Sequence, residues 1–142
     1  MVSTAESLTG GALGETLSAA PGASDTYLGG VVAYATSLKL SVLGVSEETV
    51  SRHGVVSAEC AAEMAAGVRS LTGSDVSVST TGVAGPAVQE GKPVGLVFLG
   101  VAGPRGVVTK ELHLDGDRPA VRAAACREAI SAVLAIVVAI PG

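Results

Sequence analysis

The chain has 142 residues, of which 13 are acidic and 9 basic, giving a formal net charge of −4 at pH 7. Because the few basic residues are scattered along the chain, the composition argues against a nucleic-acid-binding protein. Only 15% of the residues are charged and the mean hydropathy is +0.54, which predicts a single domain over residues 1–142 with an extensively buried core.

Neither a membrane protein nor a disulfide-stabilised secreted protein is expected. The longest apolar run, residues 129–140, is too short to span a bilayer and predicts a buried core helix. Cys60 and Cys126 are too few for a disulfide framework, and no cysteine and histidine cluster indicates a zinc site. No signal peptide is apparent. We therefore expect a cytoplasmic protein whose two cysteines act as small buried hydrophobic residues on helices.

The first half of the chain is predicted to be mainly helical after an initial strand. The apolar start, Met1 and Val2, is typical of a strand end, and the helical pattern that follows stops before Pro21. Serine favours helix N-termini and glycine favours helix ends, so these residues mark the boundaries of later helices. The expected elements are a helix at 9–19, a strand at 27–35 with Tyr34 at its end, and helices at 37–43, 46–52 and 58–72.

The second half of the chain is predicted to contain three strands and a long helix. Alternating patterns and a Gly-Pro-Arg-Gly hairpin signal predict strands at 76–80, 94–102 and 107–114. The Gly- and Pro-rich segment 82–93 is expected to be an exposed loop available for binding. Asp117 precedes a helix expected at 118–138. This order of elements predicts an α/β fold in which helices cover both faces of a mixed sheet.

The segment Thr4-Ala5-Glu6-Ser7-Leu8-Thr9-Gly10-Gly11 is the most informative part of the chain. It lies at a predicted strand-to-helix turn, where backbone N–H groups and the helix dipole suit an anion or a developing oxyanion. A serine hydroxyl there needs a base to become a nucleophile, and lysine is able to act as one. Taken alone, the segment is also explained by Ser7 capping a helix, with Thr9, Gly10 and Gly11 forming an ordinary turn.

Further motifs follow this segment in a fixed order. They are Tyr34-x4-Lys39 with Leu43-Gly44-Val45, Gly54-Val55-Val56-Ser57, Met64-Ala65-x-Gly67, Thr81-Gly82-Val83-Ala84-Gly85-Pro86, Lys92-Pro93-Val94-Gly95 and Gly116-Asp117-Arg118-x3-Arg122. From about residue 3 to about residue 138, the chain resembles the C-terminal domain of the CinA (competence/damage-inducible protein A) family. The stand-alone form of this domain is nicotinamide-nucleotide amidohydrolase, also called nicotinamide mononucleotide deamidase.

The resemblance implies a fold and a reaction. The fold is a three-layer α/β/α sandwich with a mixed central sheet. The reaction is hydrolysis of the carboxamide of nicotinamide mononucleotide to nicotinic acid mononucleotide and ammonia, with no metal or other cofactor, as a step of pyridine-nucleotide salvage. The resemblance also implies assembly into a homo-oligomer, and no nucleic acid or membrane partner is expected.

The resemblance assigns the catalytic roles to Ser7 as nucleophile, Lys39 as base and Tyr34 as their partner. Lys39 must be neutral to accept the Ser7 proton, and burial together with a neighbouring cation, Arg118 or Arg122, would lower its pKa. Tyr34 is expected to bridge Ser7 and Lys39 or to orient the amide. Without the resemblance, an exposed Lys39 and a packed Tyr34 would be the ordinary expectation.

Two further groups of residues are candidates for binding the mononucleotide. Thr81, Gly82 and Gly85 follow a predicted strand, and the glycines allow the backbone to approach a phosphate or ribose. Arg118 and Arg122 are four residues apart, so they share one helix face and form a candidate phosphate clamp. A tight turn and a solvated charged face are the ordinary alternatives.

The chain departs from the family pattern at three places. Leu8 stands where a cysteine commonly follows the serine, Thr36 stands where asparagine is frequent, and residues 87–90 replace a glycine-rich stretch. Two other functions therefore stay open. One is a catalytically silent nucleotide-binding module that acts through protein partners, and the other is an amidase for a different small carboxamide.

Overall fold

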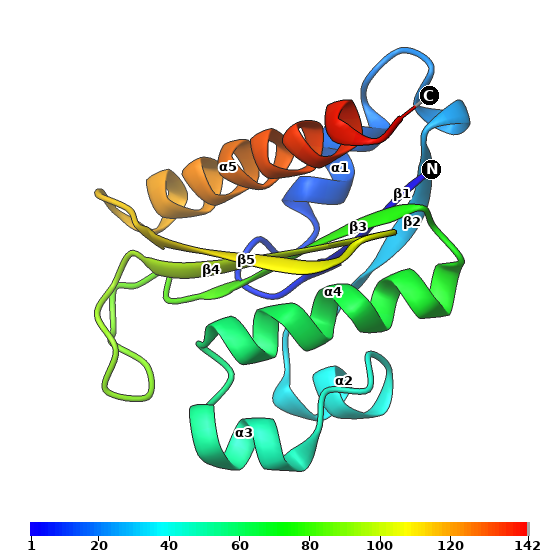
Figure 1. Cartoon of the computed structure of the whole chain (residues 1–142). Coiled ribbons are helices and arrows are strands. Elements are labelled where there is room, and N and C mark those ends of the chain that lie inside the picture. Colours follow the sequence, from blue (N-terminus) through cyan, green and yellow to red (C-terminus); the bar gives the residue numbers. More distant parts are fainter. Residues whose placement is uncertain (142) are drawn as a thin grey trace.

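A computed structural model of the chain describes residues 1–141, in which a five-stranded sheet lies between two layers of helices (Figure 1). The strands are β1 (Val2–Glu6), β2 (Tyr27–Val32), β3 (Val76–Gly82), β4 (Leu96–Gly103) and β5 (Gly106–His113). The helices are α1 (Ala12–Ser18), the 3₁₀ helix η1 (Ala23–Asp25), α2 (Thr36–Ser41), α3 (Glu47–His53), α4 (Ala58–Thr72) and α5 (Arg118–Ala139).

The sheet is mixed, with the strand order β2-β1-β3-β4-β5. Strand β1 pairs in parallel with both of its neighbours, β2 and β3. Strand β4 pairs antiparallel with both of its neighbours, β3 and β5. The carboxyl ends of three parallel strands therefore meet at one edge of the sheet, where ligands commonly bind in α/β proteins. This arrangement confirms the predicted three-layer α/β/α sandwich with a mixed central sheet.

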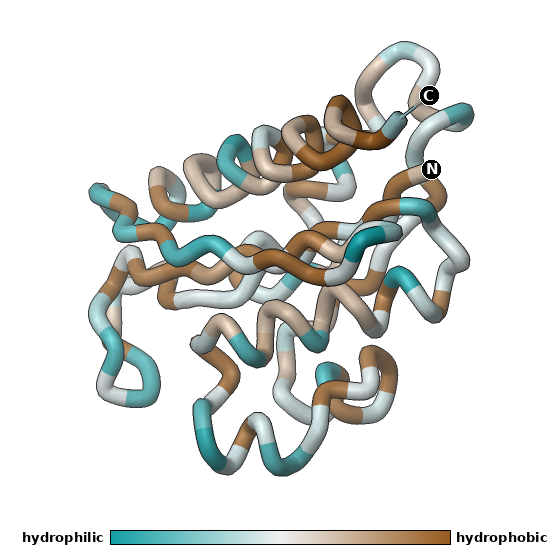
Figure 2. The backbone as a smooth tube through the Cα atoms, in the orientation of Figure 1, coloured by the Kyte–Doolittle hydropathy of each residue, from teal (hydrophilic) through white to brown (hydrophobic). Residues whose placement is uncertain are grey.

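Each face of the sheet carries its own hydrophobic core. Helices α1 and α5 cover one face, and α4 covers the other with α2 and α3 beyond it (Figure 1). Figure 2 shows hydrophobic residues along the strands and along the C-terminal half of α5. Cys60 and Cys126 are buried free cysteines, one in each core, as the sequence predicts.

Alternating side chains of β3 join the sheet to α4. Ser77 Oγ donates to Ala65 O at 2.6 Å, and Ser79 Oγ donates to Ala61 O at 2.6 Å. The intervening Val78 points to the opposite core, as the twofold alternation of a strand requires. These short bonds hold α4 close to the sheet and give the two buried serine hydroxyls the acceptors that they need.

Most predicted helix boundaries are confirmed by their capping contacts. The side chains of Ser46, Ser57 and Asp117 accept hydrogen bonds from backbone N–H groups in the first turns of α3, α4 and α5. Helix α4 begins and ends as predicted, with Gly73 in the left-handed conformation at its end. These are local signals, which is why the sequence alone locates them.

Several predicted boundaries are wrong. Helix α1 starts at Ala12 because Gly10 and Gly11 have φ angles of +57° and +104°, which no α-helix accommodates. Strand β2 ends at Val32, three residues earlier than predicted, because the chain then bends to place Ala33 and Tyr34 beside Lys39. The segment 82–93 is exposed only in its later part, since residues 83–85 are buried.

The C-terminal half of α5 is not the buried helix that its apolar sequence predicts. Ala129 and Val133 are buried, but Leu134 is 58% exposed and Val138 is 81% exposed. A helix on the outside of a three-layer sandwich buries only one face, so an apolar sequence does not ensure burial. Among residues 1–141, no helix combines the length and hydropathy needed to cross a membrane.

Candidate active site

Ser7 and Lys39 meet at the sheet edge where the parallel strands end. Ser7 directly follows β1, and Lys39 reaches it from α2 with Nζ 3.0 Å from Ser7 Oγ. Lys39 Nζ also donates to Ala33 O at 2.8 Å and to Tyr34 O at 3.1 Å. The Lys39 side chain is only 1% exposed. The structure therefore brings the predicted nucleophile and base into direct contact inside the protein.

Burial is the main influence on the Lys39 amine. Loss of solvation lowers the pKa of Lys39, while the negative potential of Cys60 and Glu90 opposes that shift. No carboxylate among residues 1–141 forms an ion pair with Lys39. Neither Arg118 nor Arg122 contributes to the shift, so the expectation that a neighbouring arginine lowers the Lys39 pKa is wrong.

The three oxygen atoms around the Lys39 amine suit the ammonium form, with three donors, and also the neutral form, if the Ser7 hydroxyl is the donor. A neutral lysine has two N–H groups and one lone pair, whereas the ammonium form has three N–H groups. The carbonyl oxygens of Ala33 and Tyr34 account for two donors, which leaves the third position facing Ser7 Oγ. With Lys39 neutral, the Ser7 hydroxyl is able to donate to the lone pair, which is the geometry of a serine activated by a base.

The helix N-terminus after Ser7 is already occupied by a carboxylate of the chain itself. Glu6, only 2% exposed, accepts hydrogen bonds from the N–H groups of Gly11 at 3.2 Å, Leu13 at 2.9 Å and Gly14 at 3.0 Å. No sequence pattern predicts that Glu6 turns inward in this way. The Glu6 carboxylate neutralises the positive end of α1, where the sequence predicts that an oxyanion or phosphate binds.

The predicted oxyanion donors are not available in this conformation. The Gly10 N–H donates to Ser7 O at 3.1 Å, and the Gly11 N–H donates to Glu6. Within residues 1–141, the N–H groups of Leu8 and Thr9 donate to no protein acceptor. Thr9 is fully buried and does not line the cleft beside Ser7, whereas Leu8 does, so the unpredicted amide of Leu8 is the one left for an oxyanion.

Thr80 of β3, which is not among the predicted site residues, binds the turn that contains Ser7 and Thr9. Its backbone oxygen accepts from Ser7 N at 3.0 Å, and its hydroxyl lies 2.8 Å from Thr9 Oγ1. Its predicted neighbour Thr81 faces the other side of the sheet, where Thr81 Oγ1 donates to Val55 O at 2.7 Å. The expectation that Thr81 binds substrate is not met by this geometry, because alternation along β3 directs Thr80 rather than Thr81 toward the Ser7 turn.

Tyr34 and Arg118 form one wall of the site. Arg118 Nη2 donates to the Tyr34 hydroxyl at 3.0 Å, and Arg118 Nη1 donates to Gly85 O at 2.8 Å. Tyr34 is 58% exposed. Its phenol does not lie between Ser7 and Lys39, and only its backbone oxygen touches the Lys39 amine. Of its two predicted roles, orienting a bound amide is the one that this position allows.

A cleft of about 290 Å³ opens beside Ser7. Its lining includes Ser7, Leu8, Tyr34, Arg118 and the segment 82–89, which contains the predicted Gly82 and Gly85. Arg122 does not line the cleft. Its Nε donates to Leu8 O at 2.9 Å and its Nη2 donates to Thr9 O at 3.0 Å. Arg122 therefore binds the backbone of the turn after Ser7 from outside the cleft. The predicted clamp of two arginines on one phosphate is therefore not formed.

Two charged side chains that no sequence motif singles out join the loop that lines the cleft to the segment between α3 and α4. The Glu90 carboxylate accepts from Val55 N at 3.1 Å and from Val56 N at 2.9 Å. Lys92 Nζ donates to the backbone oxygens of His53 and Val56. In the sequence both residues resemble solvated loop charges, and only the tertiary structure identifies their backbone partners.

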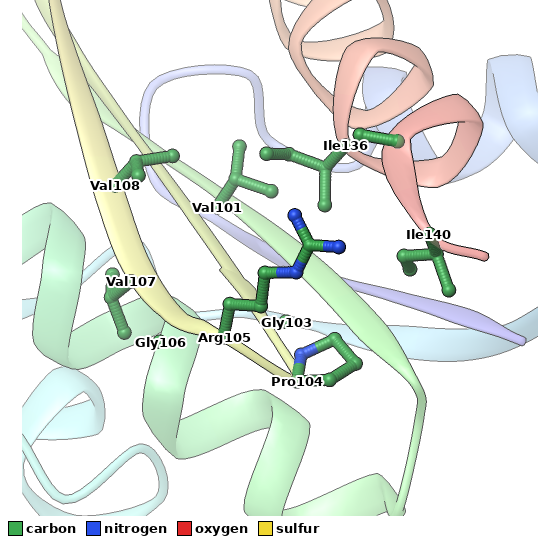
Figure 3. Close-up of a pocket in the computed structure, with 10 residues that line it drawn as sticks. Val101, Gly103, Pro104, Arg105, Gly106, Val107, Val108, Ile136 and Ile140 are labelled. Atoms are coloured by element: carbon green, nitrogen blue, oxygen red, sulfur yellow. The ribbon is translucent and has the colours of Figure 1, made fainter.

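A second cavity lies far from Ser7, between the β4–β5 hairpin and the C-terminal end of α5 (Figure 3). It encloses about 110 Å³ and is mainly apolar, with Val101, Ile136 and Ile140 around the Arg105 side chain. Because β4 runs antiparallel to β3, this hairpin is at the opposite edge of the sheet from the Ser7 turn. No group of three or more metal-ligating side chains occurs within residues 1–141.

Comparison with known proteins identifies relatives over nearly the whole chain. The model of the CinA C-terminal domain matches residues 1–137. A CinA-like protein of Frankia casuarinae is 49% identical over 137 residues, which is 96% of this chain and 32% of that protein. A putative competence-damage inducible protein of Bacillus subtilis is 49% identical over 121 residues, 85% of this chain and 29% of that protein.

Solved structures agree with this relationship. The competence damage-inducible protein A (ComA) of Klebsiella pneumoniae superposes with a TM-score of 0.95 at 35% identity, covering 99% of this chain and 88% of that one. The competence/damage inducible protein CihA of Agrobacterium tumefaciens gives 0.90 at 38% identity, covering 95% and 84%. The chain spans about a third of the length of the curated relatives it matches. It belongs to the CinA C-terminal domain family.

Proposed function

We propose that this chain is a cytosolic amidohydrolase that converts nicotinamide mononucleotide to nicotinic acid mononucleotide and ammonia, a step of pyridine-nucleotide salvage. The observation that carries the proposal is the 3.0 Å contact between Ser7 Oγ and the buried Lys39 amine. A lysine buried without a carboxylate partner is costly unless it is neutral, and a neutral amine beside a serine is a base. Membership of the CinA family supports the choice of reaction through the motif resemblance.

In the first half of the reaction, Ser7 Oγ attacks the carboxamide carbon while Lys39 takes the hydroxyl proton. The tetrahedral intermediate then collapses, the C–N bond breaks, and Lys39 returns the proton to the departing nitrogen, which leaves as ammonia. The carbonyl oxygens of Ala33 and Tyr34 keep the amine aimed at Ser7 throughout.

In the second half, water attacks the acyl-serine and gives its proton to Lys39. The ester bond breaks, Ser7 recovers its proton and the carboxylate product leaves. The unpartnered N–H group of Leu8, which lines the cleft, is the donor available to the oxyanion in both halves. All proton transfers use the same Ser7–Lys39 pair, so the cycle needs no cofactor.

The cleft supports a small substrate that carries one anionic group. Its volume of about 290 Å³ is close to the lower end of the range for small-molecule pockets, which starts near ~300 Å³. Arg118 is a cation at its wall and Tyr34 lies beside it, so Arg118 is the residue we assign to the phosphate. The glycines at positions 82 and 85 let the backbone approach the ribose.

An amidase for another small carboxamide is the second candidate. It is favoured by one observation, namely that Arg122 is engaged with Leu8 O and Thr9 O and leaves Arg118 as the arginine of the cleft. A single guanidinium gives weaker phosphate selectivity than the two that the sequence predicts. The silent-module alternative lacks such support, because binding alone requires no buried lysine beside Ser7.

The experiment that tests the proposal is an assay of ammonia release from three carboxamides, namely nicotinamide mononucleotide, its riboside and free nicotinamide. We expect the mononucleotide to be hydrolysed with the highest kcat/KM and free nicotinamide to be the poorest substrate. Equal kcat/KM values for mononucleotide and riboside would show that phosphate is not recognised, which would favour the second candidate. Binding of the mononucleotide without ammonia release would favour the silent module.

A further inference from the structure

Arg122 is the charged residue of the site region that the proposed reaction leaves without a role. It lies on α5, is half-buried and lines no part of the cleft. Its guanidinium donates to two successive carbonyl oxygens, Leu8 O at 2.9 Å and Thr9 O at 3.0 Å. Both belong to the turn that directly follows Ser7. Arg122 therefore contacts the turn after Ser7 and does not face the substrate cleft.

Each carbonyl that Arg122 holds fixes an N–H group at the other end of the same planar peptide. The oxygen of Leu8 and the N–H of Thr9 belong to one peptide unit, in which C=O and N–H point in opposite directions. Anchoring Leu8 O on a guanidinium therefore sets the direction of the Thr9 N–H. Thr9 is fully buried and does not line the cleft, so this bond fixes the path of the turn rather than a donor that reaches the substrate.

The second bond reaches the Leu8 donor through one more peptide. Arg122 fixes the oxygen of Thr9, and the N–H of the same peptide, which belongs to Gly10, donates to Ser7 O at 3.1 Å. Ser7 O and the Leu8 N–H are in turn opposite ends of one peptide. Through these two steps the guanidinium influences the orientation of the Leu8 N–H, which belongs to a residue of the cleft, and of Ser7 directly before it.

We propose that Arg122 is a positioning residue that aims the Leu8 N–H group at the oxyanion of the reaction and keeps Ser7 in register with Lys39. The inference rests on the proposed function. The positive charge of Arg122 strengthens its hydrogen bonds to the two carbonyl oxygens, because charge-assisted hydrogen bonds are stronger than neutral ones. Gly10 fits this arrangement, since a Cβ at that position would lie 3.2 Å from Arg122 Nη2.

The rest of the turn is held independently of Arg122. Glu6 binds three amides of α1 from one side, and Thr80 binds Ser7 and Thr9 from β3. Removal of the guanidinium should therefore loosen the orientation of two peptides without unfolding the domain. This separates a positioning role, which lowers kcat, from a substrate-binding role, which raises KM.

The test compares Arg122→Ala and Arg122→Lys with Arg127→Ala, an exposed arginine of the same helix, as matched control. We expect Arg122→Ala to lower kcat for nicotinamide mononucleotide by about 10²-fold or more, the effect of losing one oxyanion donor, with KM within about twofold. The kcat of Arg122→Lys should lie between those of the wild type and Arg122→Ala, because an amine keeps the charge but is unable to bind both carbonyl oxygens as the planar guanidinium does. Arg127→Ala should match the wild type.

Two further measurements exclude a merely structural effect. Millimolar methylguanidine should restore part of the kcat of Arg122→Ala and leave Ser7→Ala inactive. The rate at which a fluorophosphonate labels Ser7, followed by mass spectrometry, should fall in Arg122→Ala in parallel with kcat, because the phosphoryl oxygen uses the same donor. The Arg122→Lys variant carries the test if Arg122→Ala fails to fold.

The possible failures are distinguishable. An unchanged kcat in Arg122→Ala, or a raised KM with unchanged kcat, would overturn the positioning role. If the wild type is labelled at Ser7 but releases no ammonia from the mononucleotide, the proposed substrate is wrong, and the labelling rates of the variants still decide the role of Arg122. Absence of both labelling and hydrolysis in the wild type would overturn both proposals.

Discussion

At the residue scale, the Lys39 amine decides what the site is able to do. Burial lowers the pKa of Lys39, and its two carbonyl partners match the two donors of the neutral form. The neutral fraction therefore increases as pH rises through the lowered pKa, and protonation below that pKa removes the base. Activity should accordingly be lost on the acidic side.

We predict that kcat/KM rises with pH through the lowered pKa of Lys39, and that Lys39→Arg is nearly inactive at every pH because arginine does not deprotonate in proteins. The measurement is the pH profile of ammonia release for both proteins. Lys110→Arg, on the exposed strand β5, is the control and should keep the wild-type profile. An active Lys39→Arg enzyme would contradict the role of Lys39 as base.

A second prediction concerns Arg118, which faces the cleft. Arg118→Ala should raise KM for the mononucleotide with little change in KM for the riboside, since a charge-assisted hydrogen bond contributes about 1.5–3 kcal/mol. Initial rates over a range of concentrations of each substrate measure this difference. A fall in kcat with unchanged KM would instead assign Arg118 to orienting Tyr34.

The sequence predicts these residues unevenly. The order of the motifs identifies Ser7 and Lys39 as a pair. It does not predict that Lys39 is buried, because lysine side chains are normally exposed. Helical spacing places Arg118 and Arg122 on one face without indicating that one guanidinium meets the cleft and the other the Ser7 turn. Such distinctions depend on contacts between residues that lie from 32 to 114 positions apart, which local patterns do not encode.

At the element scale, the close contact between α4 and the sheet depends on small residues. The polar alternation of β3 predicts a strand, but it does not show that the hydroxyls of Ser77 and Ser79 bond to the carbonyls of α4. Gly100 on β4 permits the same approach, since a Cβ there would lie 2.3 Å from Ala61 O. Caps and turn glycines locate element ends, whereas this interlayer spacing is set only when the layers pack.

We predict that Gly100→Ala lowers the free energy of unfolding by about 1–3 kcal/mol, because the backbone of α4 must move to admit the methyl group. Gly103→Ala on the same strand is the matched control, since its Cβ would meet Ile136 Cγ2 at an ordinary 3.5 Å. Chemical denaturation of both variants measures the difference. Equal stability of the two variants would show that the contact between α4 and β4 is not tight.

At the scale of the whole molecule, the outer end of α5 is the largest departure from what the sequence predicts. Leu134, Val137 and Val138 are exposed on this helix, and Ile136 and Ile140 near the same end line the apolar cavity at the β4–β5 hairpin (Figure 3). Exposed apolar surface of this kind commonly marks an interface between proteins. We propose that a second copy of the chain covers it, in keeping with the homo-oligomer that the family resemblance implies.

We predict that the protein is a dimer or larger at micromolar concentration, and that Val138→Glu shifts it toward the monomer without loss of fold. Val138 is 81% exposed, so the charge should cost little in the free subunit and much in an interface. Light scattering gives the mass of both proteins, and circular dichroism checks the fold. A wild type of monomer mass only would contradict the assembly.

The central claim is that the Ser7–Lys39 pair hydrolyses a carboxamide rather than only binding a nucleotide. The most direct measurement is ammonia release from nicotinamide mononucleotide by the wild type and by Ser7→Ala, with binding of the mononucleotide measured on the same samples. We expect both proteins to bind the mononucleotide, and we expect Ser7→Ala to lose several orders of magnitude in kcat, up to about 10⁶-fold. A Ser7→Ala protein that keeps more than about a tenth of the activity would contradict the claim, because units of nucleophile and base lose far more than that.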